Sequence, residues 1–183
     1  MKHVKEIKSI FPISLGEDTI RLIELEDLDI YVDLLQSDYY NEFLDNKFNV
    51  LPKHVLMHMM EKVINNTNNN VQDGSQVRLI LVNKDNKILG GMSLFNISSI
   101  DNYMEIAYFI DCNEQHKGYC YNMVRSVLNK LNELDIGIKG YKLKIHESNA
   151  ASLRLASRLG FSESERIVGL QEMNLIMTLD KGK

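Results

Sequence analysis

The segment from residue 103 to residue 134 constrains the fold most. Residues 103–110 are mostly apolar, as in a buried strand, and a polar turn with one glycine, Gln115-His116-Lys117-Gly118-Tyr119-Cys120, follows them. Apolar residues then recur at helical spacing, at Met123, Val124, Val127, Leu128, Leu131 and Leu134. A strand that leads through a glycine turn into a long amphipathic helix predicts a sheet on which helices pack.

The rest of the chain continues this alternation. Apolar patterns predict strands over residues 19–25, 77–82, 88–97, 103–110, 141–145 and 170–179. Helices are predicted over residues 28–35, 52–63, 118–134 and 151–159. We interpret Asp27 as the N-cap of the first helix and the polar run Asn65 to Asn70 as a loop that closes the second. The order predicts an α/β fold with a mixed sheet, one domain over residues 1–183, and an N-terminal extension over residues 1–16.

Composition excludes several classes of protein. The 183 residues carry a formal net charge of −4. The chain thus lacks the basic composition that would predict nucleic acid as a partner. Cys112 and Cys120 form no metal-ligand spacing, and His54 and His58 lack an obvious third ligand, so we expect no metal. There is no apolar run of membrane-spanning length and no signal-peptide pattern at the N-terminus. We therefore expect a cytoplasmic protein with reduced thiols and no membrane partner.

The turn from Gln115 to Cys120 has the composition of an anion-binding loop. The first amides of a helix have no intrahelical acceptor, and the helix dipole adds positive potential there. Gly118 allows an anion to approach the backbone, and Lys117 can add charge. The residues alone support a phosphate cradle and an ordinary turn equally well.

This turn resembles the acetyl-CoA-binding signature of GNAT acetyltransferases, Arg/Gln-x-x-Gly-x-Gly/Ala. Gln115 and Gly118 match it, whereas Cys120 stands where the family has glycine or alanine. The resemblance implies a GNAT fold, in which a mostly antiparallel sheet splays at the cofactor and is flanked by helices. It implies that the loop, including His116, Lys117 and Tyr119, binds the pyrophosphate of acetyl-CoA. Backbone groups near Ile110 and Cys112 would bind the pantetheine arm.

A second segment resembles the same family. Ser148-Asn149-Ala150-Ala151-Ser152 leads into a short helix that ends at Gly160-Phe161, as in the motif Asn-x-x-Ser. The resemblance implies that Asn149 and Ser152 face the pantetheine arm and the acetyl site. Taken alone, the segment is explained better by Asn149 as a helix cap and Ser152 as an ordinary residue of the first turn.

The N-terminal half is similar to the Rim-type branch of the family, through Thr19-Ile20-Arg21-Leu22, Leu25, Asp27 and Leu34-Leu35. The branch implies transfer of an acetyl group from acetyl-CoA to a primary amine, either a protein N-terminus or a small molecule. No motif identifies the acceptor. Rim-type relatives are often dimers, which extends the expectation to a homodimer.

Glu105 is the candidate general base, because an ammonium must lose a proton before it attacks a thioester and a carboxylate can accept that proton. Strand alternation places Glu105 on the same face as Ala107 and Phe109. A solvated strand residue is the equal alternative. Ser152 is the second catalytic candidate, since no tyrosine follows Tyr141 to serve as general acid. Cys120 in the glycine position and the missing tyrosine also allow a different function, a non-catalytic module that binds or senses acyl-CoA.

Overall fold

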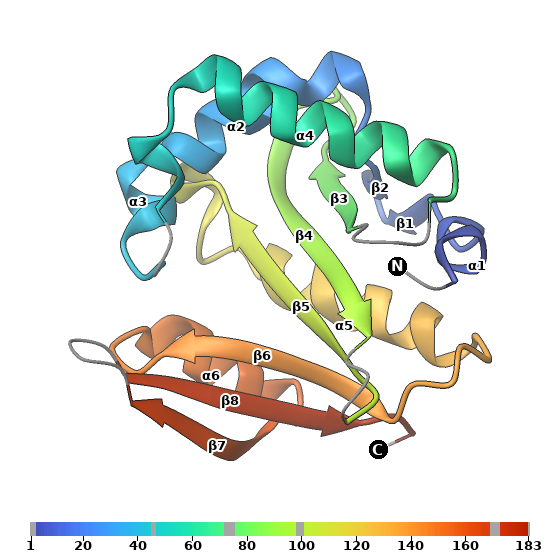
Figure 1. The fold of residues 1–183 in the computed structure, drawn as a ribbon, viewed down its shortest axis with the longest axis vertical. Helices are drawn as coiled ribbons and strands as arrows, with labels where there is room; N and C mark the ends of the chain where they lie inside the picture. Colours follow the sequence, from blue (N-terminus) through green and yellow to red (C-terminus); the bar gives the residue numbers. More distant parts are fainter. Residues whose placement is uncertain (1–2, 45–46, 72–75, 98–100, 169–172, 183) are drawn as a thin grey trace.

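The computed structural model describes residues 3–44, 47–71, 76–97, 101–168 and 173–182 (Figure 1). The strands are β1 Ile13–Leu15, β2 Asp18–Leu22, β3 Val77–Val82, β4 Ile88–Ile97, β5 Tyr103–Ile110, β6 Gly140–His146, β7 Ser162–Val168 and β8 Met173–Asp180. The α-helices are α1 Val4–Lys8, α2 Leu28–Gln36, α3 Asp38–Asn41, α4 Lys53–Asn68, α5 Tyr119–Asn132 and α6 Ala150–Arg158. Short 3₁₀ turns are η1 Leu25–Asp27, η2 Phe48–Val50 and η3 Cys112–Glu114.

The strands form one sheet with the order β1-β2-β3-β4-β5-β6-β8-β7. Neighbouring strands are antiparallel except β5 and β6, which are parallel and pair only at Tyr103↔Gly140, Met104↔Tyr141 and Glu105↔Lys142. Beyond these pairs the two strands diverge (Figure 1). We call β1–β5 the first arm of the sheet and β6, β8 and β7 the second arm. The predicted mixed, splayed sheet is confirmed.

Helices cover the two faces of the sheet unequally. On one side, which we call the α4 face, α2 and α4 pack on the first arm around Tyr31, Leu35, Leu56 and Ile80 (Figure 1). On the opposite side, the α5 face, one core joins α1, α5 and α6 to both arms, from Val4 to Met177. Alternation explains the division, because β3 sends Val77, Leu79 and Leu81 to one core and Ile80 and Val82 to the other.

The N-terminal segment contributes more structure than the sequence predicted. Val4 and Ile7 of α1 are buried in the α5-face core, and β1 pairs with β2 through Ile13↔Ile20. Both elements are too short to show a periodic pattern, so only their tertiary contacts reveal them. Residues 1–16, where they are described, thus form part of the sheet and core.

Asp27 is the N-cap residue of α2, as predicted, but its side chain makes no capping hydrogen bond to that helix. Its carboxylate accepts two hydrogen bonds from Arg21, at 2.7 and 2.9 Å, and one from the amide of Glu24 at 2.8 Å. The predicted strand also ends at Leu22, because Leu25 begins the 3₁₀ turn that presents Asp27 to Arg21. An ionised partner outcompetes the helix amides, since charge-assisted hydrogen bonds are the stronger ones.

The predicted loop from Asn65 to Asn70 is helical up to Asn68, where α4 ends, and only Asn69 and Asn70 form a turn. The ammonium group of Lys8 donates to the carbonyls of Thr67 and Asn68, at 3.0 and 3.1 Å. Carbonyls at a helix C-terminus lack intrahelical donors and favour a cation, so α1 supplies the cap that the local sequence does not show.

The last predicted strand is confirmed as β8, and a strand that was not predicted, β7, pairs with it. Residues 170–172 of the prediction lie outside the described residues, and β8 begins at Met173. Its partner β7 was missed because Ser162-Glu163-Ser164-Glu165-Arg166 has no apolar alternation, and all seven residues of β7 are exposed. The remaining predicted strands and helices are confirmed within a few residues. No helix within the described part of the chain is long and apolar enough to cross a membrane.

Candidate active site

The site is centred where β5 and β6 separate. After Glu105↔Lys142 the two strands are no longer paired with each other, although β5 continues along β4 to Ile110 and β6 continues along β8 to His146. The edge of β5 that faces away from β4 over residues 106–110 is therefore available to another extended group. A pantetheine arm, which contains two amides, can bind such an edge as an added strand does.

The loop from Gln115 to Cys120 lies directly beyond the end of β5. Gly118 is the N-cap residue of α5 with φ +80°, and His116 also has a positive φ of 61°. The first turn of α5 is closed by the Asn122 amide on the Gly118 carbonyl at 3.1 Å. The amides of Tyr119 and Cys120 therefore belong to the helix start that has no intrahelical acceptor, which is the geometry that binds phosphate.

Two lysines share one carboxylate at this loop. Glu114 accepts from Lys117 at 2.7 Å and from Lys87 at 2.5 Å. These two ammonium groups lower the pKa of Glu114 to about 2, and Glu114 in turn raises the pKa of Lys117. His116 and Lys117 are exposed. Glu114 and the two lysines together carry one net positive charge, which adds to the positive potential of the backbone amides and the helix dipole.

The substitution of cysteine for the small residue of the signature does not obstruct the loop. Tyr119 and Cys120 are partly buried and pack against the α5-face core. Burial raises the pKa of the Cys120 thiol to about 12, so it stays protonated at neutral pH. Cys112 is exposed on η3, and both cysteines are free thiols. Cys120 therefore acts as a small apolar residue.

Asn149 caps α6, as the alternative interpretation of that segment predicted. Its side-chain oxygen accepts from the Ser152 amide at 3.0 Å. The carbonyl of Ser152 receives the Tyr108 hydroxyl at a long 3.5 Å, a contact that reaches from β5 across to α6. Burial raises the pKa of Tyr108, which keeps this phenol protonated. Sequence reasoning missed Tyr108, because it searched for a tyrosine only after residue 141.

Glu105 belongs to the last pair before the strands separate, and its side chain lies on the α4 face. It is half-buried and lines a cleft of about 470 Å³. The cleft continues over the second arm, whose α4 face has no helix over it among the described residues. Its charged lining comprises Asp101, Glu105, Glu165, Lys142 and Lys144. Lys142 pairs with Asp101 at 3.3 Å.

A second cleft of about 320 Å³ lies between α2, α3 and the end of β5. It is mainly apolar, with Ile30, Leu34, Tyr40 and Phe109 in its wall, and it also includes Ile110 and Cys112. Phe109 packs against Tyr31 and Tyr40, with ring centroids 5.9 and 5.0 Å apart. Two clefts therefore approach β5 from the α4 face.

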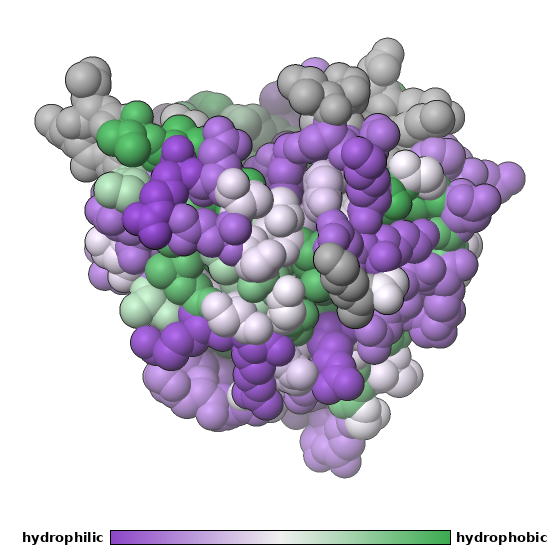
Figure 2. Space-filling model, turned by 90° about the horizontal axis from the view of Figure 1, so that it is seen from below, coloured by the Kyte–Doolittle hydropathy of each residue, from purple (hydrophilic) through white to green (hydrophobic). Residues whose placement is uncertain are grey.

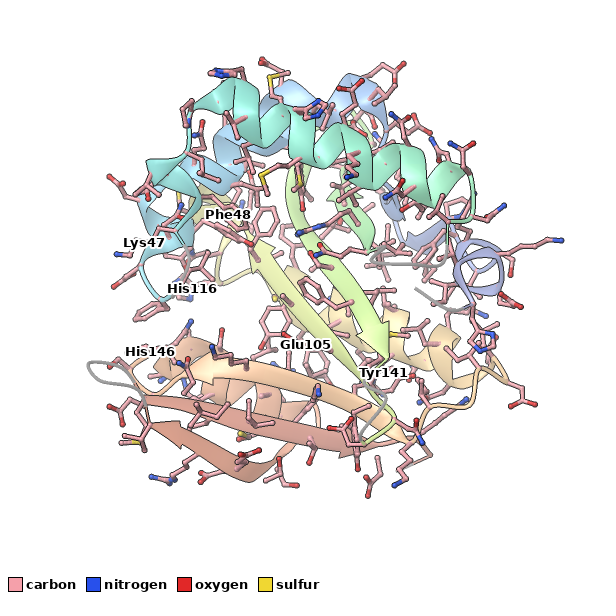
Figure 3. The ribbon with its side chains drawn as sticks, in the orientation of Figure 1. Lys47, Phe48, Glu105, His116, Tyr141 and His146 are labelled. Atoms are coloured by element: carbon pink, nitrogen blue, oxygen red, sulfur yellow. The ribbon has the colours of Figure 1, made fainter. Side chains whose placement is uncertain are left out.

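The segment after α3 reaches the second arm. The ring of Phe43 lies 6.0 Å from that of His146, whose Nδ1 accepts from the Ser148 amide at 3.2 Å. In Figure 3, Glu105 lies on β5, His146 lies at the far end of β6, and Lys47 and Phe48 lie on the opposite side of the space between the arms. The predicted residues thus gather in three places: Glu105 at the last strand pair, Ile110 to Cys120 beyond β5, and Asn149 and Ser152 beyond β6.

The chain belongs to the GNAT acetyltransferase family, because the model of the acetyltransferase (GNAT) domain matches residues 19–162. It is therefore an acetyl-CoA-dependent N-acetyltransferase, as the sequence predicted. No curated protein matches the chain.

Solved structures share the fold at low identity. A ribosomal-protein-S5-alanine acetyltransferase from Vibrio fischeri has a TM-score of 0.77 at 14% identity, covering 94% of this chain and 97% of its own. RimL, a ribosomal L7/L12 α-N-protein acetyltransferase in complex with coenzyme A, has a TM-score of 0.77 at 15% identity, with coverages of 92% and 96%. A spermidine N-acetyltransferase from Vibrio cholerae in complex with CoA and spermine has a TM-score of 0.72 at 17% identity, with coverages of 91% and 97%.

Proposed function

We propose that residues 1–183 form one cytoplasmic acetyltransferase domain that transfers the acetyl group of acetyl-CoA directly to a primary amine. The amides at the start of α5 hold the pyrophosphate, and the free edge of β5 up to Ile110 and Cys112 holds the pantetheine arm. Asn149 and Ser152, at the start of α6, border the pantetheine from the side of β6. One observation carries this proposal: the β5–β6 ladder stops at Glu105, which lines the cleft on the α4 face, and leaves the edge of β5 unpaired with β6 from there toward the start of α5.

Glu105 is the general base in this proposal. Its carboxylate takes a proton from the acceptor ammonium, directly or through a water, and the amine nitrogen then attacks the thioester carbonyl. A backbone amide of the free β5 edge stabilises the oxyanion. Collapse of the intermediate forms the amide bond and breaks the C–S bond, and the CoA thiolate leaves and takes up a proton. Thiolates leave readily, so a proton from Ser152 or Tyr108 contributes less than the base does.

The acceptor is a protein N-terminus or a small amine. Similar folds are described as acting on a ribosomal-protein alanine, on L7/L12 and on spermidine, which supports an amine without selecting one. A spermidine N-acetyltransferase from Vibrio cholerae has a dodecameric structure, which supports self-association, and we retain a homodimer in the proposal. Burial keeps the Cys120 thiol protonated, which supports direct transfer without a covalent enzyme intermediate on this residue.

Calorimetric titration of acetyl-CoA tests the proposal, with ATP as a control ligand. We expect saturable binding of acetyl-CoA that Gly118→Val weakens about 5- to 30-fold, because a left-handed conformation costs an L-residue about 1–2 kcal/mol. A Cβ at Gly118 would meet only the side-chain Nδ2 of Asn122, at 3.9 Å, so backbone conformation and not crowding causes the effect.

Gly16→Val is the matched control. Gly16 also has a positive φ, +69°, and its Cβ would meet nothing within 4 Å, but it lies in the β1–β2 turn. It should lower stability by a similar amount and leave acetyl-CoA affinity intact. Absence of acetyl-CoA binding to the wild type would remove the proposed function.

A further inference from the structure

Arginine side chains from α5 and α6 meet at one tyrosine near the start of α5. The two helices lie on the α5 face, one on each arm of the sheet (Figure 1). The guanidinium of Arg158 lies 4.1 Å over the Tyr121 ring, and that of Arg125 lies 5.7 Å from the centre of the same ring. Nη1 of Arg125 also donates to the Tyr121 hydroxyl at 3.1 Å. Tyr121 therefore brings two cations from different helices together.

The segments that carry these arginines contain no acidic residue. Residues 115–132 and 148–162 lack aspartate and glutamate, although the whole chain has a net charge of −4. Their lysines and arginines are Lys117, Arg125, Lys130, Arg154 and Arg158. The two lysines are bound to Glu114 and Glu133. None of the three arginines forms an ion pair with a carboxylate of the described residues, so their charge is not balanced there.

The two guanidinium groups at Tyr121 are arranged to receive an anion. Both arginines are exposed, and like charges on one ring repel each other. Arg158 lies over the ring and donates no hydrogen bond to the described part of the chain, so its N–H groups are available to a ligand. A guanidinium presents these donors in a planar fork that matches phosphate, and the resulting hydrogen bonds are charge-assisted. A phosphate between the two groups would replace their repulsion by attraction.

The arginine pair lies beside the proposed pyrophosphate site. Gly118, Tyr121 and Arg125 follow each other at i, i+3 and i+7, so they share one face of α5. With a rise of about 1.5 Å per residue, Tyr121 lies about 5 Å along the helix axis from Gly118. Side chains lean toward the N-terminus of a helix, which directs Arg125 toward the same end. In CoA the 3′-phosphate and the pyrophosphate are separated by a single ribose, so a second phosphate close to the helix start is expected.

We propose that Arg125 and Arg158 bind the 3′-phosphate of acetyl-CoA. The inference rests on the proposed function and adds the residues that recognise the adenosine end of the cofactor. Tyr121 is a positioning residue, because its ring and hydroxyl hold the two guanidinium groups side by side. Recognition of this phosphate would let the enzyme distinguish free acetyl-CoA from acyl carriers that present the same pantetheine arm without it.

CoA and 3′-dephospho-CoA form a matched pair of ligands for the test, because they differ only in this phosphate. Each is titrated by calorimetry into the wild type and into the double variant Arg125→Gln, Arg158→Gln. We expect the wild type to bind CoA about 10-fold or more tightly than 3′-dephospho-CoA, as for hydrogen bonds between charged groups. The double variant should bring this ratio to about one by weakening CoA alone. Tyr121→Phe, which removes the acceptor of Arg125 and keeps the ring, should give an intermediate ratio.

Lys130→Gln is the matched control variant, because it removes from the same helix a cation that is already paired with Glu133 at 3.0 Å. It should leave the ratio between the two ligands unchanged, which separates a specific contact from a general loss of positive charge. Equal affinity of the wild type for the two ligands, or an unchanged ratio in the folded double variant, would overturn the inference. Failure of the wild type to bind either ligand would instead overturn the proposed function.

Discussion

The two arms of the sheet are built from the same antiparallel pairing but are buried very differently. All six residues of β3 in the first arm are buried, whereas all seven residues of β7 in the second arm are exposed. The first arm has helices on both faces, and the second has α6 on one face. Seen from below, the surface shows mostly hydrophilic residues with smaller hydrophobic patches between them (Figure 2). This difference indicates that the first arm holds the site residues in fixed positions, whereas the second arm forms a polar, solvent-accessible wall of the cleft.

The arms meet along a narrow seam. Three residue pairs between β5 and β6 join them, and the Tyr103 hydroxyl adds a hydrogen bond to Asp180 at 2.5 Å. The Tyr141 hydroxyl binds Asn132 of α5 at 2.8 Å. Glu105 lies at the open end of this seam and Gly140 at its closed end. Substitutions at the two ends should therefore affect different quantities, catalytic rate at Glu105 and stability at Gly140.

The largest expected effect is at the open end. Glu105→Gln should lower kcat by about 10²–10⁴-fold, because it removes the proton acceptor, and should leave the Kd for acetyl-CoA unchanged. Glu165→Gln, in the second arm of the same cleft, is the control and should keep most of the activity. Steady-state kinetics and calorimetry measure the two quantities. Full activity in Glu105→Gln would show that the base lies elsewhere or that none is needed.

A substitution at the closed end of the seam should lower the stability of the fold. A Cβ at Gly140 would lie 2.1 Å from the Leu179 carbonyl oxygen and 2.9 Å from the Tyr103 ring. Gly140→Ala should therefore lower the free energy of unfolding by about 1–3 kcal/mol or more, because backbone of β8 must shift. Denaturant titration measures it. Gly137→Ala provides the comparison, because nothing lies within 4 Å of its Cβ and only its positive φ of +66° costs stability, about 1–2 kcal/mol; a larger loss there than at Gly140 would contradict a crowded seam.

A smaller effect is expected at Asn149, where capping and cofactor binding can be separated. Asn149→Ala should cost about 1 kcal/mol of stability, because the Ser152 amide loses its acceptor. Asn149→Asp keeps the cap and should retain the thermal midpoint, but a carboxylate beside the pantetheine arm should weaken acetyl-CoA binding several-fold. Unchanged acetyl-CoA affinity in both variants would leave Asn149 with the capping role alone.

The smallest effect concerns pH and the phosphate loop. Because Lys117 and Lys87 lower the pKa of Glu114 to about 2, ionised Glu114 stabilises the folded protein above its ordinary pKa near 4.5. This contribution is lost as the pH falls through about 2. The thermal midpoint of Glu114→Gln should therefore lie slightly below that of the wild type at pH 6 and converge with it toward pH 2. Glu133→Gln is the exposed control, and a difference that grows on acidification would contradict the assignment.

Sequence reasoning predicted the first arm better than the second, for physical reasons. Buried strands and amphipathic helices leave an apolar period, so β3, β4 and α5 could be predicted with the loop at Gly118. The strand β7 buries none of its residues and therefore leaves no such signal. The role of Lys8 at the end of α4 and that of Arg21 at Asp27 depend on contacts between distant segments. Arg78 was visible as a charge within an apolar run, but only the structure reveals that it is buried and donates to Ser93 and Gln76.

The early end of the β5–β6 ladder has a consequence for hydrogen exchange. Amides in the middle of an eight-stranded sheet are normally the slowest to exchange with solvent, because they open only when the fold does. The β5 amides over residues 106–110 that point away from β4 form an edge inside the sheet. They should exchange as quickly as those of a terminal strand and become protected when a pantetheine arm fills the space. A strand at the centre of the sheet would then report cofactor occupancy.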